Sequence, residues 1–121
     1  KLTEYKNFAI LDVGMNDLMR PALYDAWHNV RTLQNSDSEE RIYELVGPVC
    51  ESADVLAKDR KLAIAQKDVI AIMDVGSYGS VMSSNYNSRL KAPEIMVSGS
   101  SARIIKRRES FEDLIALEKD L

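Results

Sequence analysis

The sequence has 121 residues, enough for one domain with a hydrophobic core and too few for two, so we treat 1–121 as a single domain. Apolar residues make up 45% and charged residues 29%, as in ordinary globular proteins, and no apolar run reaches the roughly 20 residues that cross a bilayer. The 16 basic and 19 acidic side chains are mixed along the chain and give a net charge of −3, so no nucleic-acid or membrane partner is expected.

The first half of the chain alternates short strand patterns with turn signals. The apolar run at 8–13 predicts a buried strand, and Asn16 or Asp17 is expected to cap a short helix at 20–25. Alternating side chains predict strands at 27–33 and 41–46, separated by the polar loop 34–40. The segment 55–62 is compatible with either a strand or a turn.

The second half contains one strong strand pattern and a hairpin pattern. Residues 69–75 predict a buried strand, and 83–88 a polar loop. A hairpin is expected from 95–97 and 102–105, followed by a short C-terminal helix capped by Ser110. Many short strands with brief connections favour a mainly β fold, a Greek-key-like barrel or sandwich with short helices.

Arg20 and Tyr24 are four residues apart in the predicted first helix and therefore share one face. A guanidinium beside a phenol hydroxyl suits a carboxylate ligand, which arginine can bind with two parallel hydrogen bonds. The spacing alone favours a plainer interpretation, in which an exposed arginine packs over the tyrosine ring.

Cys50 and Glu51 follow Gly47-Pro48, where a strand ends and a turn must begin. An exposed cysteine there can serve as an acid or nucleophile, although a lone cysteine is more often a small buried apolar residue. Glu51 can pair with a substrate ammonium. Because Cys50 is the only cysteine, no disulfide can form within the chain, and we expect a cytoplasmic protein. One cysteine and one histidine cannot supply a structural zinc site.

Tyr78 lies between Gly76 and Gly79, just after the strongest predicted strand. The glycines allow a ligand to approach the backbone closely, and the tyrosine hydroxyl can donate to a phosphate or carboxylate. A glycine-bounded turn whose tyrosine covers the end of the core is equally compatible with the pattern.

Taken together and in order, these segments resemble one family over nearly the whole chain. Its motifs are matched by Asp12-Val13-Gly14-Met15-Asn16-Asp17-Leu18-Met19-Arg20-Pro21-Ala22-Leu23-Tyr24, Gly47-Pro48-Val49-Cys50-Glu51-Ser52-Ala53-Asp54, Gly76-Ser77-Tyr78-Gly79, Met82-Ser83-Ser84-Asn85-Tyr86-Asn87-Ser88-Arg89 and Arg107-Arg108-Glu109-Ser110-Phe111-Glu112-Asp113-Leu114. The family is the diaminopimelate decarboxylases, relatives of ornithine and arginine decarboxylases and, more distantly, of alanine racemase. Departures at Val75, Ser77, Ser80-Val81 and Leu90-Lys91 touch loop packing rather than the polar groups.

The resemblance implies a two-domain enzyme in which this chain is the C-terminal β-domain. The start at Lys1, close to an apolar run, also resembles a cut into a larger protein. The other domain, an α/β barrel, would carry the lysine that binds pyridoxal 5'-phosphate, so that lysine is not expected among the lysines here. The implied reaction converts meso-2,6-diaminopimelate to L-lysine and CO2, the last step of lysine biosynthesis, and this chain alone is expected to be inactive.

The same resemblance implies a role for each candidate residue. Cys50 would be the catalytic acid, and Glu51 would bind the distal amino group of the substrate. Arg20 and Tyr24 would hold its distal carboxylate, and Tyr78 would contact both cofactor and substrate. The family's active site lies at a homodimer interface, so Cys50 and Glu51 would act in the partner's site.

Two alternatives compete with this interpretation. The first is another basic amino-acid decarboxylase of the same fold, acting for example on ornithine, arginine or carboxynorspermidine. Arg20 disfavours it, because those substrates have no distal carboxylate. The second is a non-catalytic interaction domain that retains the fold, and the Cys50–Glu51 pair disfavours that, because a scaffold has no use for it.

Overall fold

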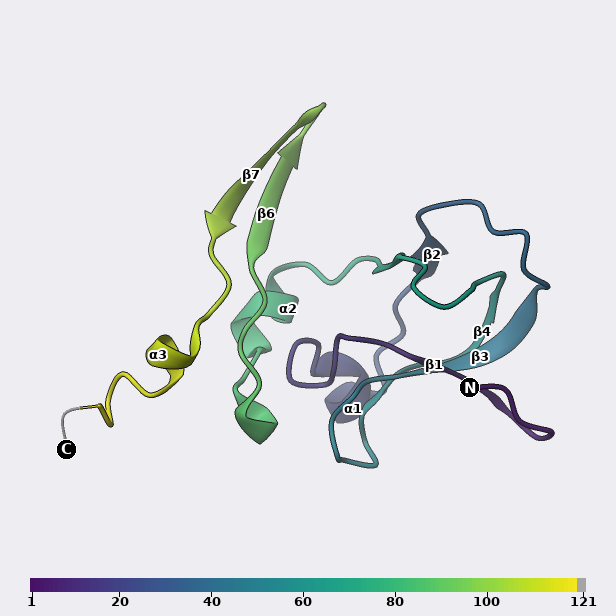
Figure 1. Cartoon of the computed structure of the whole chain (residues 1–121), viewed down its shortest axis with the longest axis horizontal. Coiled ribbons are helices and arrows are strands. Elements are labelled where there is room, and N and C mark those ends of the chain that lie inside the picture. The colour runs from purple at the N-terminus through teal and green to yellow at the C-terminus, as the bar shows by residue number, and fades with distance from the viewer. Residues whose placement is uncertain (120–121) are drawn as a thin grey trace.

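The computed structural model describes residues 1–119 and is mainly β, as predicted from the sequence (Figure 1). The strands are β1 (Asn7–Ile10), β2 (Val30–Thr32), β3 (Arg41–Val46), β4 (Val55–Leu62), β5 (Ile70–Ile72), β6 (Glu94–Ser98) and β7 (Ser101–Lys106). The helices are α1 (Arg20–Tyr24), α2 (Ser77–Met82) and α3 (Phe111–Leu114), with a 3-10 turn, η1, at Tyr86–Ser88. Within the described residues no helix is long and apolar enough to cross a membrane.

The first sheet has the strand order β1-β3-β4, and its β1 and β3 are parallel. Their register runs from Asn7 opposite Tyr43 to Ile10 opposite Val46. β4 returns antiparallel to β3, with register shifts between Tyr43 and Val46. Because parallel strands end at the same edge of a sheet, the segments that follow β1 and β3 leave the sheet side by side.

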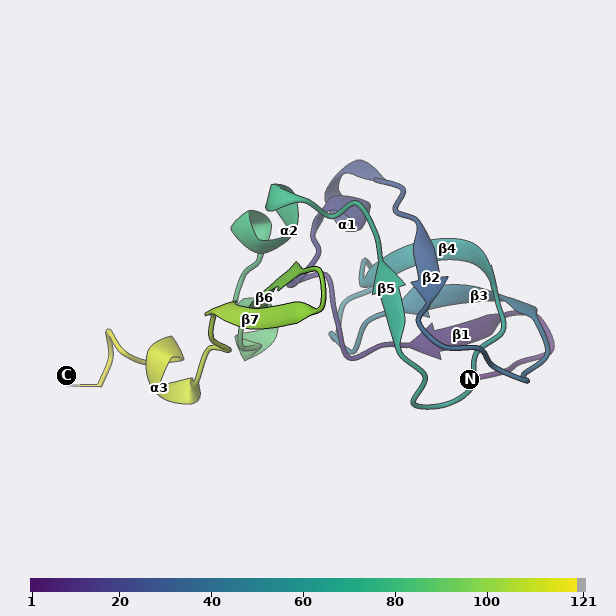
Figure 2. The same cartoon turned by 90° about the horizontal axis from the view of Figure 1, so that it is seen from above.

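The core lies between this sheet and a second, antiparallel pair formed by β2 and β5. Figure 2 shows β2 and β5 lying across the face of β1, β3 and β4. The side chains of the core come from both layers. The buried ones are Val30, Tyr43, Leu45, Ala57 and Leu62, and those that pack against them are Ala9, Leu11, Ile64, Ile70 and Ile72. The described strands therefore form a small sandwich; they remain in separate sheets and do not close into a barrel.

The β6–β7 hairpin is the third sheet and projects from the rest of the chain (Figure 1). It turns at Gly99, whose φ of 58° is readily adopted by glycine. Apolar side chains on both strands are exposed, among them Val97 and Ile104. The hairpin matches the one predicted from the sequence, although each strand is slightly longer.

Some predicted details differ from the structure. The expected cap of the first helix is wrong: Met19 occupies the N-cap position of α1 and gives no side-chain bond. Asn16 and Asp17 are not free to cap, because Asp17 accepts from the Gly14 amide and Asn16 accepts from Arg89. By contrast, Ser110 caps α3, as predicted, and the structure adds that Ser110 and Asp113 form a complete capping box.

Candidate functional site

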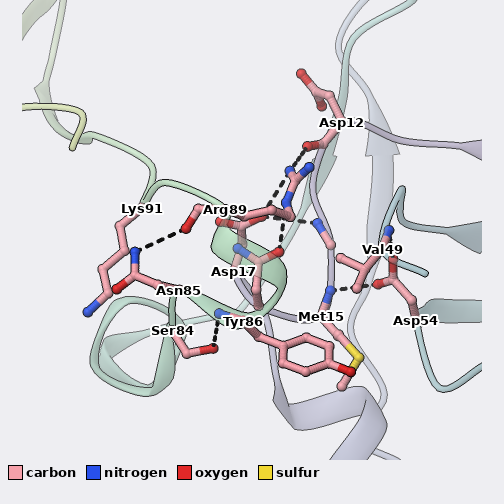
Figure 3. Close-up of polar contacts among 12 residues, drawn as sticks. Asp12, Met15, Asp17, Val49, Asp54, Ser84, Asn85, Tyr86, Arg89 and Lys91 are labelled. Carbon is pink, nitrogen blue, oxygen red and sulfur yellow. Dashed lines mark hydrogen bonds and ion pairs between the residues drawn. The ribbon is translucent and has the colours of Figure 1, made fainter. Parts of the chain in front are cut away.

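A buried carboxylate joins the two loops that leave the sheet side by side. Asp54, only 3% exposed, lies at the end of the β3–β4 loop. Its Oδ1 accepts from the Met15 amide at 2.6 Å, and its Oδ2 accepts from the Val49 amide at 2.7 Å (Figure 3). One side chain therefore fixes the segment that leads to Arg20 against the loop that carries Cys50 and Glu51.

Gly47 is needed for this arrangement. A Cβ added there would lie 2.3 Å from one carboxylate oxygen of Asp54 and 2.4 Å from the other. Real Cβ contacts are never that short, so a side chain at this position would push Asp54 away from the two amides. The glycine that the sequence pattern marks as a strand end is therefore a point of close packing as well.

Arg20, Tyr24 and Tyr78 form one cluster. The Arg20 guanidinium lies 5.5 Å from the centre of the Tyr24 ring and 5.2 Å from that of Tyr78, both within cation–π range. Tyr24 and Tyr78 are 64% and 59% exposed, respectively. The packing of Arg20 over Tyr24 is the plainer arrangement that the spacing predicts. Tyr78 is exposed and does not cover the end of the core.

Cys50 and Glu51 lie exposed at the tip of the β3–β4 loop. Backbone bonds shape this tip: the Glu51 amide donates to Val49, and the Asp54 amide donates to Glu51. Exposure removes the interpretation of Cys50 as a small buried apolar residue. A thiol and a carboxylate are therefore presented together, on a turn held at its base by Asp54.

Glu51 has a partner that the sequence analysis did not identify. The Tyr86 hydroxyl donates to Glu51 Oε2 at 3.2 Å. Hydrogen bonds from the Ala53 amide, Tyr86 and Ser52 lower the pKa of Glu51 from its ordinary value. Conversely, the bond to Glu51 and the charge of that carboxylate raise the pKa of Tyr86. At neutral pH the pair is therefore an ionised carboxylate beside a protonated phenol.

Arg89 connects the Tyr86 loop to the rest of the site. Its Nε donates to Asn16 Oδ1 at 2.9 Å. Its Nη2 donates to the Asp12 carbonyl at 2.7 Å (Figure 3). Asp17 lies 3.8 Å from the same Nη2. Asn16 is completely buried, so its end of the part-buried bond to Arg89 is shielded from water.

The predicted site residues therefore form two groups. Cys50 and Glu51 make up one, and the other consists of Arg20, Tyr24 and Tyr78. Among the described residues, no hydrogen bond or ion pair joins Cys50 or Glu51 to Arg20, Tyr24 or Tyr78. Asp54, Tyr86 and Arg89 were missed as functional residues, because each acts across a large separation in sequence. The sequence signal that could have identified two of them is that Tyr86 and Arg89 are the only large side chains in the segment 83–89, which otherwise consists of serines and asparagines.

Comparison with known proteins identifies a family that matches more than half of the chain. Residues 1–76 match the family described as the pyridoxal-dependent decarboxylase C-terminal sheet domain. This chain belongs to that family. Among the relatives of this pyridoxal-dependent decarboxylase sheet domain are diaminopimelate decarboxylases from Pseudomonas aeruginosa, 52% identical over 98% of this chain, and from Vibrio cholerae, 49% identical over 100%. The chain spans 28% and 29% of those two proteins, respectively.

A solved structure also resembles this decarboxylase sheet domain. The diaminopimelate decarboxylase of Helicobacter pylori, complexed with L-lysine, superposes with a TM-score of 0.88 and 46% identity. The match covers 96% of this chain and 29% of that one. The arrangement of strands and loops described above therefore occurs in a solved decarboxylase.

Proposed function

We propose that this chain is the sheet domain of a diaminopimelate decarboxylase, which converts meso-2,6-diaminopimelate to L-lysine and CO2. Relatives about half identical over the whole chain carry that name. The observation that carries the proposal is the pairing of an exposed thiol and an ionised carboxylate, Cys50 and Glu51, on one rigid turn. A module used only for protein interactions has no need of that pair.

In this proposal, selection of the substrate belongs to Arg20, Tyr24 and Glu51. Diaminopimelate has a distal carboxylate and a distal ammonium, and these residues supply a matching cation, hydroxyl and anion. Arg20 is half-buried beside two tyrosine rings, which limits its movement. Ornithine and arginine have no distal carboxylate, so Arg20 favours diaminopimelate over them.

Cys50 would provide the proton that completes the reaction. Loss of CO2 breaks a carbon–carbon bond and leaves its electron pair on the substrate carbon. The Cys50 thiol donates its proton to that carbon, and the resulting thiolate is reprotonated from water. The exposure of Cys50 allows both exchanges.

The residues around Tyr78 fit pyridoxal phosphate. The ring is exposed beside the Arg20 guanidinium, and the space where a Gly76 side chain would project is open to 4 Å. The phenol ring of Tyr78 and its hydroxyl suit an aromatic, anionic cofactor, and Arg20 is left to the distal carboxylate of the substrate. When bound, that cofactor withdraws electrons from the reacting carbon. Its Schiff-base lysine would lie in the α/β barrel of the same polypeptide and not in this chain.

We further propose that the enzyme is a cytoplasmic homodimer with shared active sites, in which residues 1–121 form one domain. Cys50 and Glu51 would complete the partner's site, and Arg20, Tyr24 and Tyr78 their own. The absence of contacts between the two groups, among the residues described, is compatible with this division.

The test uses the full-length enzyme and follows CO2 release from meso-diaminopimelate, with ornithine as the comparison substrate. Cys50→Ala should lower kcat far more than it raises KM. Arg20→Ala should cost about 2–5 kcal/mol in kcat/KM if the arginine binds a buried carboxylate. Arg31→Ala, an exposed arginine on β2, is the matched control and should leave the rate unchanged.

Faster turnover of ornithine than of diaminopimelate by the wild-type enzyme would refute the substrate assignment. Unchanged turnover by Cys50→Ala would remove the thiol from the reaction. The isolated chain should release no CO2, and measurable release would contradict the assignment of the cofactor lysine to another domain.

A further inference from the structure

Both carboxylate oxygens of Glu51 are held. Oε1 accepts from the Ser52 hydroxyl at 3.2 Å and from the Ala53 amide at 3.4 Å, both within its own turn. Oε2 accepts from Tyr86, which is 35 residues away in sequence. The phenol is thus the one donor from outside the turn that contacts Glu51 among the residues described, and it determines which way Oε2 faces.

We propose that Tyr86 is a positioning residue for Glu51: its hydroxyl orients the carboxylate for the distal ammonium of the substrate. This inference rests on the proposed function, which gives Glu51 that ammonium as its ligand. Tyr86 acts through Glu51 and not on the substrate.

The loop that carries Tyr86 is anchored well enough to place the phenol. The Ser84 amide donates to the backbone carbonyl of buried Asn16 at 2.8 Å, and the Tyr86 amide donates to Ser84 Oγ at 3.3 Å. At the far end of the loop, Arg89 is bonded to Asn16 and to the Asp12 carbonyl. Both ends are therefore attached to the loop that precedes Arg20.

The backbone between these anchors is strained. Asn87 and Ser88 have φ values of 59° and 56°, in the left-handed region that side chains other than glycine seldom adopt. Asparagine adopts this region comparatively often, so a cost of order 1–3 kcal/mol falls mainly on Ser88, whose conformation persists only where the surroundings enforce it. Here the Arg89 and Ser84 contacts enforce it, and the turn directs Tyr86 toward Glu51 (Figure 3 shows the anchoring residues).

The electrostatics of the pair match this role. The carboxylate raises the pKa of the Tyr86 hydroxyl, so the phenol keeps its proton and remains a donor at neutral pH. The phenol in turn helps to lower the pKa of Glu51. Its removal should therefore raise the pKa of Glu51 and leave Oε2 free to rotate.

The test compares Tyr86→Phe with the wild type in the full-length enzyme, using two substrates. One is meso-diaminopimelate. The other is D-2-aminopimelate, which keeps the reacting centre and the distal carboxylate but has no distal ammonium. We expect KM for diaminopimelate to rise about 3- to 10-fold, the effect of one lost hydrogen bond, with kcat little changed. The kinetic constants for aminopimelate should not change.

The pH profile provides a second readout. Without Tyr86 the acid limb of kcat/KM for diaminopimelate should move to higher pH, because Glu51 then protonates more readily. In a Glu51→Ala background, which has no side-chain acceptor for the phenol, Tyr86→Phe should have no further effect on KM. Tyr5→Phe, a 96% exposed tyrosine, is the matched control and should behave as the wild type.

Two results would overturn the proposal. One is an unchanged KM for diaminopimelate in Tyr86→Phe. The other is an equal loss on both substrates, which a folding defect would produce. Failure of the proposed function is seen separately, because the wild-type enzyme itself would then not decarboxylate diaminopimelate.

Discussion

Replacing Asp54 with alanine should loosen both loops of the site at once. The change removes the side-chain acceptors of the part-buried Met15 amide and the buried Val49 amide. An unsatisfied buried donor costs about 1–3 kcal/mol, which applies to the buried Val49 amide, and the part-buried Met15 amide adds to that cost. Asp54→Asn retains one acceptor oxygen and turns an NH2 toward the other amide, so at least half of that cost remains.

Hydrogen exchange measured by mass spectrometry on the full-length enzyme tests this prediction. Each 1.4 kcal/mol lost locally speeds exchange tenfold, so peptides covering 12–18 and 47–54 should exchange at least about tenfold faster in Asp54→Ala. A peptide from the β6–β7 hairpin should not change. Asp37→Ala, in an exposed loop, is the matched control. Wild-type exchange rates at both loops in Asp54→Ala would refute the role of this carboxylate.

Three further predictions concern the backbone and the charge pairs. Gly47→Ala should lower the free energy of unfolding, measured by thermal denaturation, by about 1–3 kcal/mol. The loss should be smaller in an Asp54→Ala background, because the added Cβ clashes with the Asp54 carboxylate. An equal loss in both backgrounds would contradict this explanation. Gly76→Ala should also lower the free energy of unfolding by about 1–3 kcal/mol. The cause would be backbone strain alone, from the φ of 59° and ψ of −157°, because no atom lies within 4 Å of the added Cβ. An unchanged melting temperature would count against this strain. The hydrogen bond from Arg107 is the main cause that lowers the pKa of Asp113. The ionised Asp113 carboxylate should therefore stabilise α3 fully above about pH 3.8, and this stabilisation is lost as the pH falls further. Exchange protection of α3, corrected for intrinsic rates, should fall below that pH in the wild type and be insensitive to pH in Asp113→Asn, and equal pH dependence in both would refute it.

Local patterns predicted those elements whose side chains follow one simple period. β3 has the predicted bounds, 41–46, and the β6–β7 hairpin and the Ser110 cap of α3 also match. β4 could not be decided because four charged residues, 58–61, occupy its middle, and Asp59 has a φ of 53°. The register shifts between β3 and β4 break the alternation that a sequence pattern relies on.

α2 and the contacts of the site were beyond local reasoning. The segment 77–82 contains a glycine and two serines, which are weak helix formers, so its helix depends on its surroundings in the fold. The candidate residues Arg20, Cys50 and Tyr78 were identified one motif at a time. The placement of Arg20 relative to Cys50 depends on the parallel pairing of β1 with β3 across more than 30 residues, for which no nearby sequence carries a signal.

The parallel pairing of β1 with β3 sets how the two loops of the site are aligned with each other. A slip of β1 by one residue along β3 would move its backbone by about 3.3 Å and turn its side chains to the opposite face. The Met15 amide would then be out of reach of Asp54, and the loop that precedes Arg20 would no longer align with the turn that carries Glu51. Insertions in the exposed loop 34–40 should leave this alignment intact, whereas a single residue inserted at 11–13 should disrupt it.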